Sequence, residues 1–256
     1  MIAKILVCLA AGMGAGIGTG LAGLSAAAVI SPMLITFLGF DAYEAVGIAL
    51  ASDVLASAIS AYTYGKHKNL DIKNGLVMLF TVLVFTMVGS YIASLLPNTT
   101  MGGFSVFMTL LLGIKFIVRP VMTTKEQLEE KDKKTKIIQS ILCGIVIGFI
   151  CGFIGAGGGM MMLLMLTSIL GYELKTAVGT SVFIMSFTAF TGAVSHFSIS
   201  GSLPDIPALV LCVLFTLIGA RVAARFANKA PAKTLNRATG VVLSVLGIAM
   251  VAVKYL

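Results

Sequence analysis

Two glycine-rich segments could let the backbone itself contact a ligand. Each interrupts a long apolar run, and because glycine weakens a helix by about 1 kcal/mol per residue, we expect a helix to break at both. The backbone N–H groups at the start of the following short helix would carry the positive end of its dipole, which favours an anion. The candidate substrate-binding residues at these breaks are Gly20, Gly23 and Ser25 in the first segment, and Gly155, Gly157, Gly158 and Gly159 in the second.

Helix packing is the alternative explanation for some of these glycines. Gly12, Gly16 and Gly20 follow the small-xxx-small spacing by which membrane helices approach one another closely. Packing therefore accounts for most of that series, whereas the run 155–159 favours a role at a binding site.

Asp53 is a third candidate, because it lies in the middle of the apolar block 45–64, where an isolated carboxylate is expensive. It could take up a proton together with an anion and release it on the far side. It could instead accept hydrogen bonds from Ser52, Ser57 or the backbone and fix a helix. Both roles remain open.

The composition assigns these residues to an integral membrane protein. The chain of 256 residues is 58% hydrophobic and 11% charged, with a mean hydropathy of +1.05. So few charges cannot cover a soluble globule, which excludes a water-soluble enzyme and a nucleic-acid binder. Neither of the two histidines lies near a cysteine or carboxylate at metal-ligand spacing, so we expect no metal and no cofactor.

Long uncharged runs indicate an all-α protein with ten helical elements. Two of the eight apolar blocks are too long for one span and contain the glycine breaks, so each supplies a long and a short helix. The blocks are 1–40, 45–64, 76–96, 102–118, 137–170, 176–195, 208–225 and 238–256.

The chain matches itself at an offset of 132 residues, which indicates an internal duplication. The predicted organisation is a membrane repeat over 1–118, a charged cytoplasmic linker over 119–136 and a second membrane repeat over 137–256. The matching residues are Gly12, Gly16, Gly20 and Gly23 with Gly144, Gly148, Gly152 and Gly155, and Met33, Leu34, Leu38 and Gly39 with Met165, Leu166, Leu170 and Gly171.

Loop charges predict that the second repeat is inverted. The loop 65–75 carries three lysines, whereas its counterpart 196–207 carries no basic residue. The next pair reverses, because 97–101 has no basic residue and 226–237 has three. Basic loops remain in the cytoplasm, and five elements per repeat also require inversion. Both termini then lie outside, and Lys4 runs against this assignment.

The chain resembles the TauE/SafE sulfite exporter-like permeases. The resemblance rests on GFIGAGGG at 152–159 and LGYELKTAVGTS at 170–181, with counterparts GLAGLSAAAVISPML at 20–34 and LGFDAYEAVG at 38–47. It implies transport of small sulfur-containing anions such as sulfite or sulfonates without ATP. Thr180 and Ser181 stand where the family's hydroxyls stand and would bind the anion, or else bond back to a helix carbonyl.

These observations predict a multi-pass secondary active transporter of the cytoplasmic membrane. It would move a small anion by alternating access, with sulfur oxyanions suggested by the resemblance alone and protons as a candidate coupling ion through Asp53. A passive anion channel is the first alternative. A membrane-embedded enzyme is the second, and no recurring catalytic set supports it.

Overall fold

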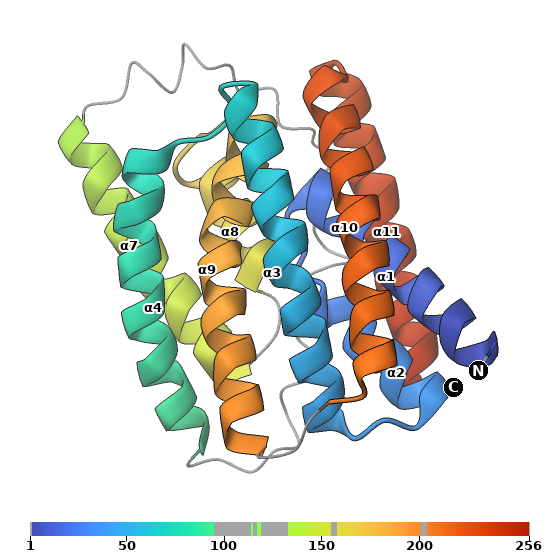
Figure 1. Ribbon diagram of the computed structural model, residues 1–256. Helices are drawn as coiled ribbons and strands as arrows, with labels where there is room; N and C mark the ends of the chain where they lie inside the picture. Colours follow the sequence, from blue (N-terminus) through green and yellow to red (C-terminus); the bar gives the residue numbers. More distant parts are fainter. Residues whose placement is uncertain are drawn as a thin grey trace.

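The computed structural model is all-helical in the part of the chain that it describes, which is residues 2–94, 114, 117–118, 133–154, 158–200 and 204–255. The first run that was predicted to break does so between α1 and α2, and the all-α prediction is confirmed (Figure 1). Residues 155–157 of the second predicted break lie outside the described residues. The helices are α1 Ile2–Ala22, α2 Ala27–Leu38, α3 Ala42–Lys66, α4 Ile72–Ser94, α7 Lys133–Ile154, α8 Gly158–Ser168, α9 Leu174–Ser200, α10 Ile206–Lys229 and α11 Ala232–Tyr255.

Helix ends extend beyond the apolar blocks. Helix α7 begins at Lys133, inside the predicted linker 119–136, and α3 continues to Lys66. Lysine is a good helix former and can extend its charged end toward water, so hydropathy alone underestimates these helices. The predicted block 102–118, apart from 114 and 117–118, and most of the linker lie outside the described residues.

Helices α2 and α8 are too short to cross a membrane. They have 12 and 11 residues, or about 18 and 16 Å, against a hydrocarbon core of about 30 Å. Helix α2 packs against α1, α3 and α11, and α8 packs against α7 and α9. The two short helices therefore lie among longer ones, which positions the breaks in the interior.

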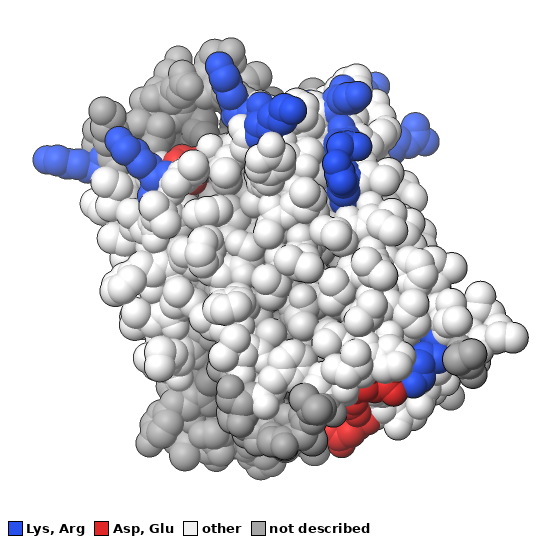
Figure 2. All heavy atoms as spheres, in the orientation of Figure 1, with Lys and Arg blue, Asp and Glu red and all other residues white. Residues whose placement is uncertain are grey.

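The long helices have the composition and surface of membrane spans. Apolar side chains on α4, α10 and α11 are exposed, including Phe80, Val222 and Ile248. Figure 2 shows a broad uncharged band between two charged ends. Four described segments are long and apolar enough to cross a membrane: Ile2–Ala22, Glu44–Lys66, Leu174–Val194 and Ile206–Lys229.

Glycines of the two predicted repeats make matching contacts. Gly16 on α1 packs against the carbonyl oxygen of Thr216 on α10. Gly148 on α7, 132 positions later, packs in the same way against the carbonyl oxygen of Val82 on α4. The first helix of each predicted repeat thus pairs with the fourth helix of the other, because glycine lets the backbones approach closely.

The ends of the short helices also match. Gly39 and Gly171 both have positive φ, 67° and 75°. The next residue after each bonds back six positions, Phe40 N–H to the Leu34 carbonyl and Tyr172 N–H to the Leu166 carbonyl. Helices α3 and α9 pack together and run in opposite directions (Figure 1). The inverted-repeat organisation stays a prediction, which these equivalences support.

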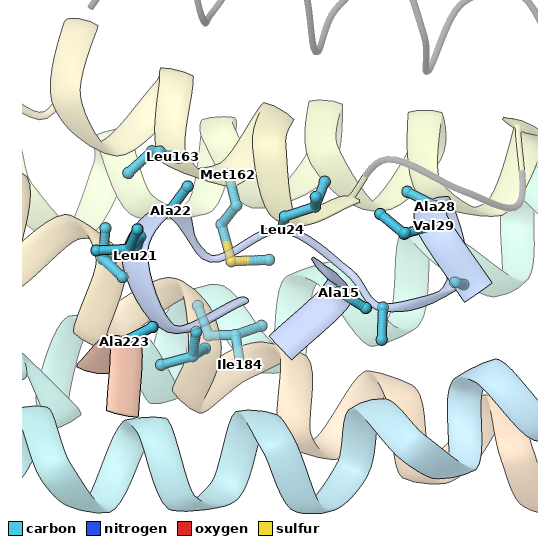
Figure 3. Close-up of a cluster of buried hydrophobic side chains, with 14 of the residues drawn as sticks. Ala15, Leu21, Ala22, Leu24, Ala28, Val29, Met162, Leu163, Ile184 and Ala223 are labelled. Atoms are coloured by element: carbon cyan, nitrogen blue, oxygen red, sulfur yellow. The ribbon is translucent and has the colours of Figure 1, made fainter. Parts of the chain in front are cut away.

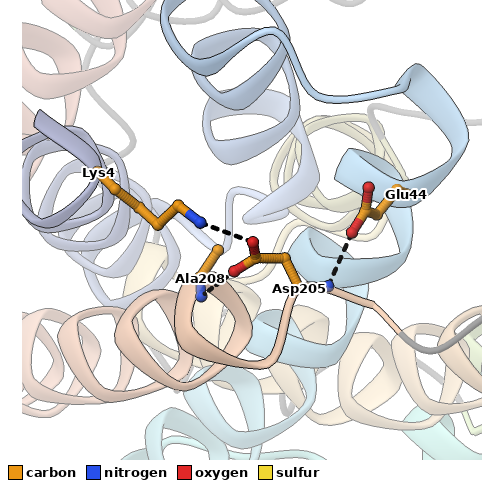
Figure 4. Close-up of polar contacts among 4 residues, drawn as sticks. All are labelled: Lys4, Glu44, Asp205 and Ala208. Atoms are coloured by element: carbon orange, nitrogen blue, oxygen red, sulfur yellow. Dashed lines mark hydrogen bonds and ion pairs between the residues drawn. The ribbon is translucent and has the colours of Figure 1, made fainter. Parts of the chain in front are cut away.

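Charge is divided between the two ends of the molecule. Lysine and arginine side chains gather at the upper end in Figure 2, where α3 and α10 finish, with one acidic patch among them, and the other acidic side chains in view gather at the lower end. Lys4 is the basic residue that ran against the predicted external position of the N-terminus. Its Nζ lies 2.6 Å from a carboxylate oxygen of Asp205, so the acidic end itself neutralises it (Figure 4).

Candidate functional site

The first break is a glycine-terminated helix end. Helix α1 stops where Gly23 takes a φ of 64°, a left-handed conformation that other residues rarely adopt. The Gly23 N–H donates to the Thr19 carbonyl, and the Leu24 N–H donates to the Gly18 carbonyl. The chain then crosses Ser25 and Ala26 before α2 begins. Leu21, Ala22 and Leu24 lie among side chains of α8, α9 and α10 (Figure 3).

Side-chain hydroxyls satisfy two carbonyl groups at this break, one in the last turn of α1 and one in the segment that follows it. The Tyr64 hydroxyl on α3 donates to the Gly20 carbonyl at 2.8 Å. The Thr19 hydroxyl donates to the Leu24 carbonyl at 2.7 Å. Carbonyl groups that lack a partner within a helix need one elsewhere, so these hydrogen bonds stabilise the non-helical segment inside the protein. The role of Tyr64 at the break was not predicted, because nothing in the sequence around it indicates a partner 44 residues away.

Asp53 contacts the same break. It is 1% exposed, and its carboxylate accepts hydrogen bonds from the Ser25 hydroxyl at 2.8 Å and the Ser57 hydroxyl at 2.9 Å. The Ala26 N–H is a third donor. Asp53 therefore caps the start of α2 from a neighbouring helix. Ser52, which the sequence offered as a donor, bonds instead to the Ile48 carbonyl of its own helix.

The start of α8 lies against the first break. A Cβ atom on Gly159, in the first turn of α8, would collide with the carbonyl oxygen of Gly23 and lie 2.5 Å from the sulfur of Met185. Met185 occupies the position on α9 that Asp53 occupies on α3 at the repeat offset. Gly158 begins α8, whereas Gly155 and Gly157 lie outside the described residues.

Of the two predicted hydroxyl residues, only Ser181 lies at the breaks. A Cβ on Gly23 would collide with the Ser181 hydroxyl oxygen, which also donates to the Val178 carbonyl at 2.9 Å. The Thr180 hydroxyl faces another way and accepts the Asp71 N–H at 3.2 Å, near the start of α4. Successive helix residues point about 100° apart, which explains the separation.

Gly20 has a packing contact as well as a place at the break. A Cβ there would lie 2.5 Å from the Ala220 carbonyl oxygen on α10, which is the close approach that the small-xxx-small spacing predicted. The group that meets in the interior consists of Gly23, Ser25, Asp53, Gly159 and Ser181. Both short helices begin within a few residues of the contact between Gly23 and Gly159. Their positive dipole ends therefore lie in the same region.

Comparison with known proteins identifies the chain. A profile of the family described as Sulfite exporter TauE/SafE matches residues 8–250. The chain belongs to this family. The probable membrane transporter protein YunE of Bacillus subtilis is 29% identical over 267 residues, covering 96% of each chain. A probable membrane transporter protein of Methanocaldococcus jannaschii is 26% identical over 251 residues, covering 92% of this chain and 91% of the relative. This TauE/SafE protein is thus a membrane transporter.

Proposed function

We propose that the protein is a secondary active transporter that moves a small anion across the cytoplasmic membrane by alternating access. The observation that carries the proposal is the contact between the first break and the start of α8, Gly23 against Gly159, deep among long apolar helices. A paired set of broken helices from two repeats is the arrangement in which secondary transporters hold their substrates.

An anionic substrate fits the electrostatics of this region. The starts of α2 and α8 offer backbone N–H groups with the positive end of each helix dipole. At α2 the Asp53 carboxylate accepts the Ser25 hydroxyl and the Ala26 N–H, and the N–H groups of the first turn donate to the carbonyls of Ser25 and Ala26. At α8 the equivalent neighbour is the uncharged Met185, so we assign the anion to the side of Gly158 and Gly159. The Ser181 hydroxyl, which lies against Gly23, is the side-chain candidate for a further contact.

The substrate class rests on the family, whose description names sulfite export. Sulfite and organosulfonates are compact oxyanions with several acceptor oxygens, which suits backbone N–H donors that approach closely at glycine. The two inverted repeats would alternate the access to such a site. The opposite directions of α3 and α9 support that inversion.

The test is a Gly159→Ala variant in proteoliposomes, with sulfite counterflow exchange as the readout. The added Cβ would collide with the Gly23 carbonyl, so we expect exchange to fall about tenfold or more while the protein remains in the membrane. Gly14→Ala is the matched control, because a Cβ there makes ordinary contacts of 3.7 and 3.8 Å.

A second measurement covers the case in which Gly159→Ala fails to fold. Wild-type protein in detergent is heated with sulfite, thiosulfate, sulfate or a sulfonate, and an anion at a hundred times its Kd should stabilise it by about 2.7 kcal/mol. The absence of both stabilisation and counterflow for every anion would overturn the proposal. Anion flux that neither saturates nor shows counterflow would indicate that the protein is a passive anion channel instead.

A further inference from the structure

One face of α3 carries a file of buried polar side chains. Asp53, Ser57, Ser60 and Tyr64 follow one another at intervals of four, three and four residues, so they share a face of the helix. Each is at most 1% exposed. The file extends for eleven residues, about 16 Å, and ends two residues before α3 finishes at Lys66.

The same face is apolar on the other side of Asp53. Ala49 and Ala45, four and eight residues earlier, are 0% exposed and carry no polar atom in their side chains. Beyond them, Lys4, Glu44 and Asp205 bond to one another at the acidic end of the molecule. Along this face of α3, the buried polar side chains therefore continue from Asp53 toward the basic end, which the charge division assigns to the cytoplasm.

Ser60 is the unexplained member of this file. Its hydroxyl is completely buried and has no hydrogen-bond partner. Its neighbours are satisfied, because Ser57 donates to Asp53 and Tyr64 donates to the Gly20 carbonyl. A buried hydroxyl without a partner costs about 1–3 kcal/mol, so its presence between two satisfied hydroxyls calls for a functional explanation.

The charged groups around the file lie at its two ends. Helices α1, α2, α9 and α10 pack against α3, and α2 carries no titratable side chain. Among the described side chains of these five helices, Asp53 is the only carboxyl between the two ends. The titratable side chains are Lys4 and Cys8 on α1, Lys175 on α9, Cys212, Arg221, Arg225 and Lys229 on α10, and Glu44, Tyr62, Tyr64 and Lys66 on α3 itself.

We propose that the hydroxyls of Ser57 and Ser60 form the path by which a proton from the cytoplasm reaches Asp53. Tyr64 closes the cytoplasmic end of this path. This rests on the proposed transport of an anion and adds the coupling ion and its side of entry. A hydroxyl both donates and accepts, so Ser57 can give its proton to the carboxylate and take another from Ser60. Ser60 has no hydrogen bond in this structure, so its hydroxyl must move within reach of Ser57 and then take its own proton from cytoplasmic water that enters when the Tyr64 hydroxyl leaves the Gly20 carbonyl. The net change is one cytoplasmic proton consumed and one carboxylate converted to a carboxylic acid.

The test compares Ser60→Ala with Ser52→Ala in proteoliposomes. Ser52 is equally buried on α3 but bonds back to its own helix, so it controls for the loss of a hydroxyl. Two rates are measured, sulfite counterflow without a pH gradient and net sulfite flux with one. We expect Ser60→Ala to retain the wild-type rate of counterflow, whereas the acceleration of net sulfite flux by the pH gradient should fall about tenfold. Ser52→Ala should keep both, and Ser60→Thr should restore the acceleration.

The outcomes separate the path from the transport function. Undiminished acceleration in Ser60→Ala, an equal loss in Ser52→Ala, or a loss of counterflow in Ser60→Ala would each overturn the path. Wild-type counterflow without any pH-driven acceleration would also overturn it while leaving anion transport in place. A wild-type protein without counterflow would instead overturn the proposed function.

Discussion

Lys4 and Asp205 form an ion pair that links the start of α1 to the start of α10. Asp205 accepts the Ala208 N–H as the cap of α10, and its own N–H donates to Glu44 at 2.7 Å (Figure 4). The Lys4 ammonium, together with the Ala208 N–H, holds the pKa of the Asp205 carboxyl below its ordinary value. The two side chains are 32% and 29% exposed, so solvent weakens the pair.

Lys4→Met should lower the free energy of unfolding by about 0–1 kcal/mol at neutral pH, as for other partly exposed pairs. Because the folded pKa of Asp205 is lowered, the pair stabilises the protein above the unfolded pKa of about 4 and its contribution disappears as the pH falls through the folded value. Thermal unfolding in detergent at several pH values measures this. A difference between wild type and variant that persists unchanged in strong acid would argue against the ion pair.

At the scale of the helices, glycine sets how closely α1 and α10 approach. A Cβ on Gly16 would collide with the Thr216 carbonyl oxygen and lie 2.7 Å from the Ala220 nitrogen. Neither is the movable end of a side chain, so the helices themselves would have to separate. Helix α7 and helix α4 repeat this contact through Gly148.

Gly16→Ala should therefore destabilise the protein by about 1–3 kcal/mol, which is the usual cost of overpacking. Gly14→Ala, on another face of α1, should be neutral or stabilise by up to about 1 kcal/mol because alanine is the better helix former. Thermal unfolding of both variants in the same detergent gives the comparison. Equal stability of the two variants would show that the helices can separate without cost.

The first break was predictable from sequence because glycine acts locally, and α1 and α2 divide where Gly20 and Gly23 indicated. The buried carboxylate of Asp53 was predictable from its apolar surroundings. Its donors were only partly predictable, since Ser25 lies 28 residues away and reaches it through the packing of α2 on α3. The pairing of Asn69 with Asn228 joins residues 159 apart, and a single sequence contains no signal for it.

For the whole molecule, the division of charge predicts the orientation in the membrane. Basic residues concentrate where α3 and α10 end, and the cytoplasmic side of a membrane protein keeps such residues. Lys73 and Lys233 are exposed side chains at the basic end, and Asp41 is an exposed side chain at the acidic end.

Single cysteines at Lys73 and Lys233 in a cysteine-free background should react with an impermeant reagent only from the cytoplasmic side. A cysteine at Asp41 should react only from outside. Labelling of intact cells and of inverted vesicles makes the comparison, with each variant first shown to transport. Reaction of the Lys73 and Lys233 cysteines from opposite sides would end the inverted-repeat arrangement.

The close packing of α1 on α10 also has a consequence for biosynthesis. The ribosome must add roughly 180 residues after α1 before α10 begins, which takes about 10–40 seconds at ordinary rates of synthesis. During that interval the glycine face of α1 and the ammonium group of Lys4 are without the partners they have in the folded protein. The nascent α1 therefore depends on lipid, on its own hairpin with α2 or on the insertion machinery until α10 has been synthesised.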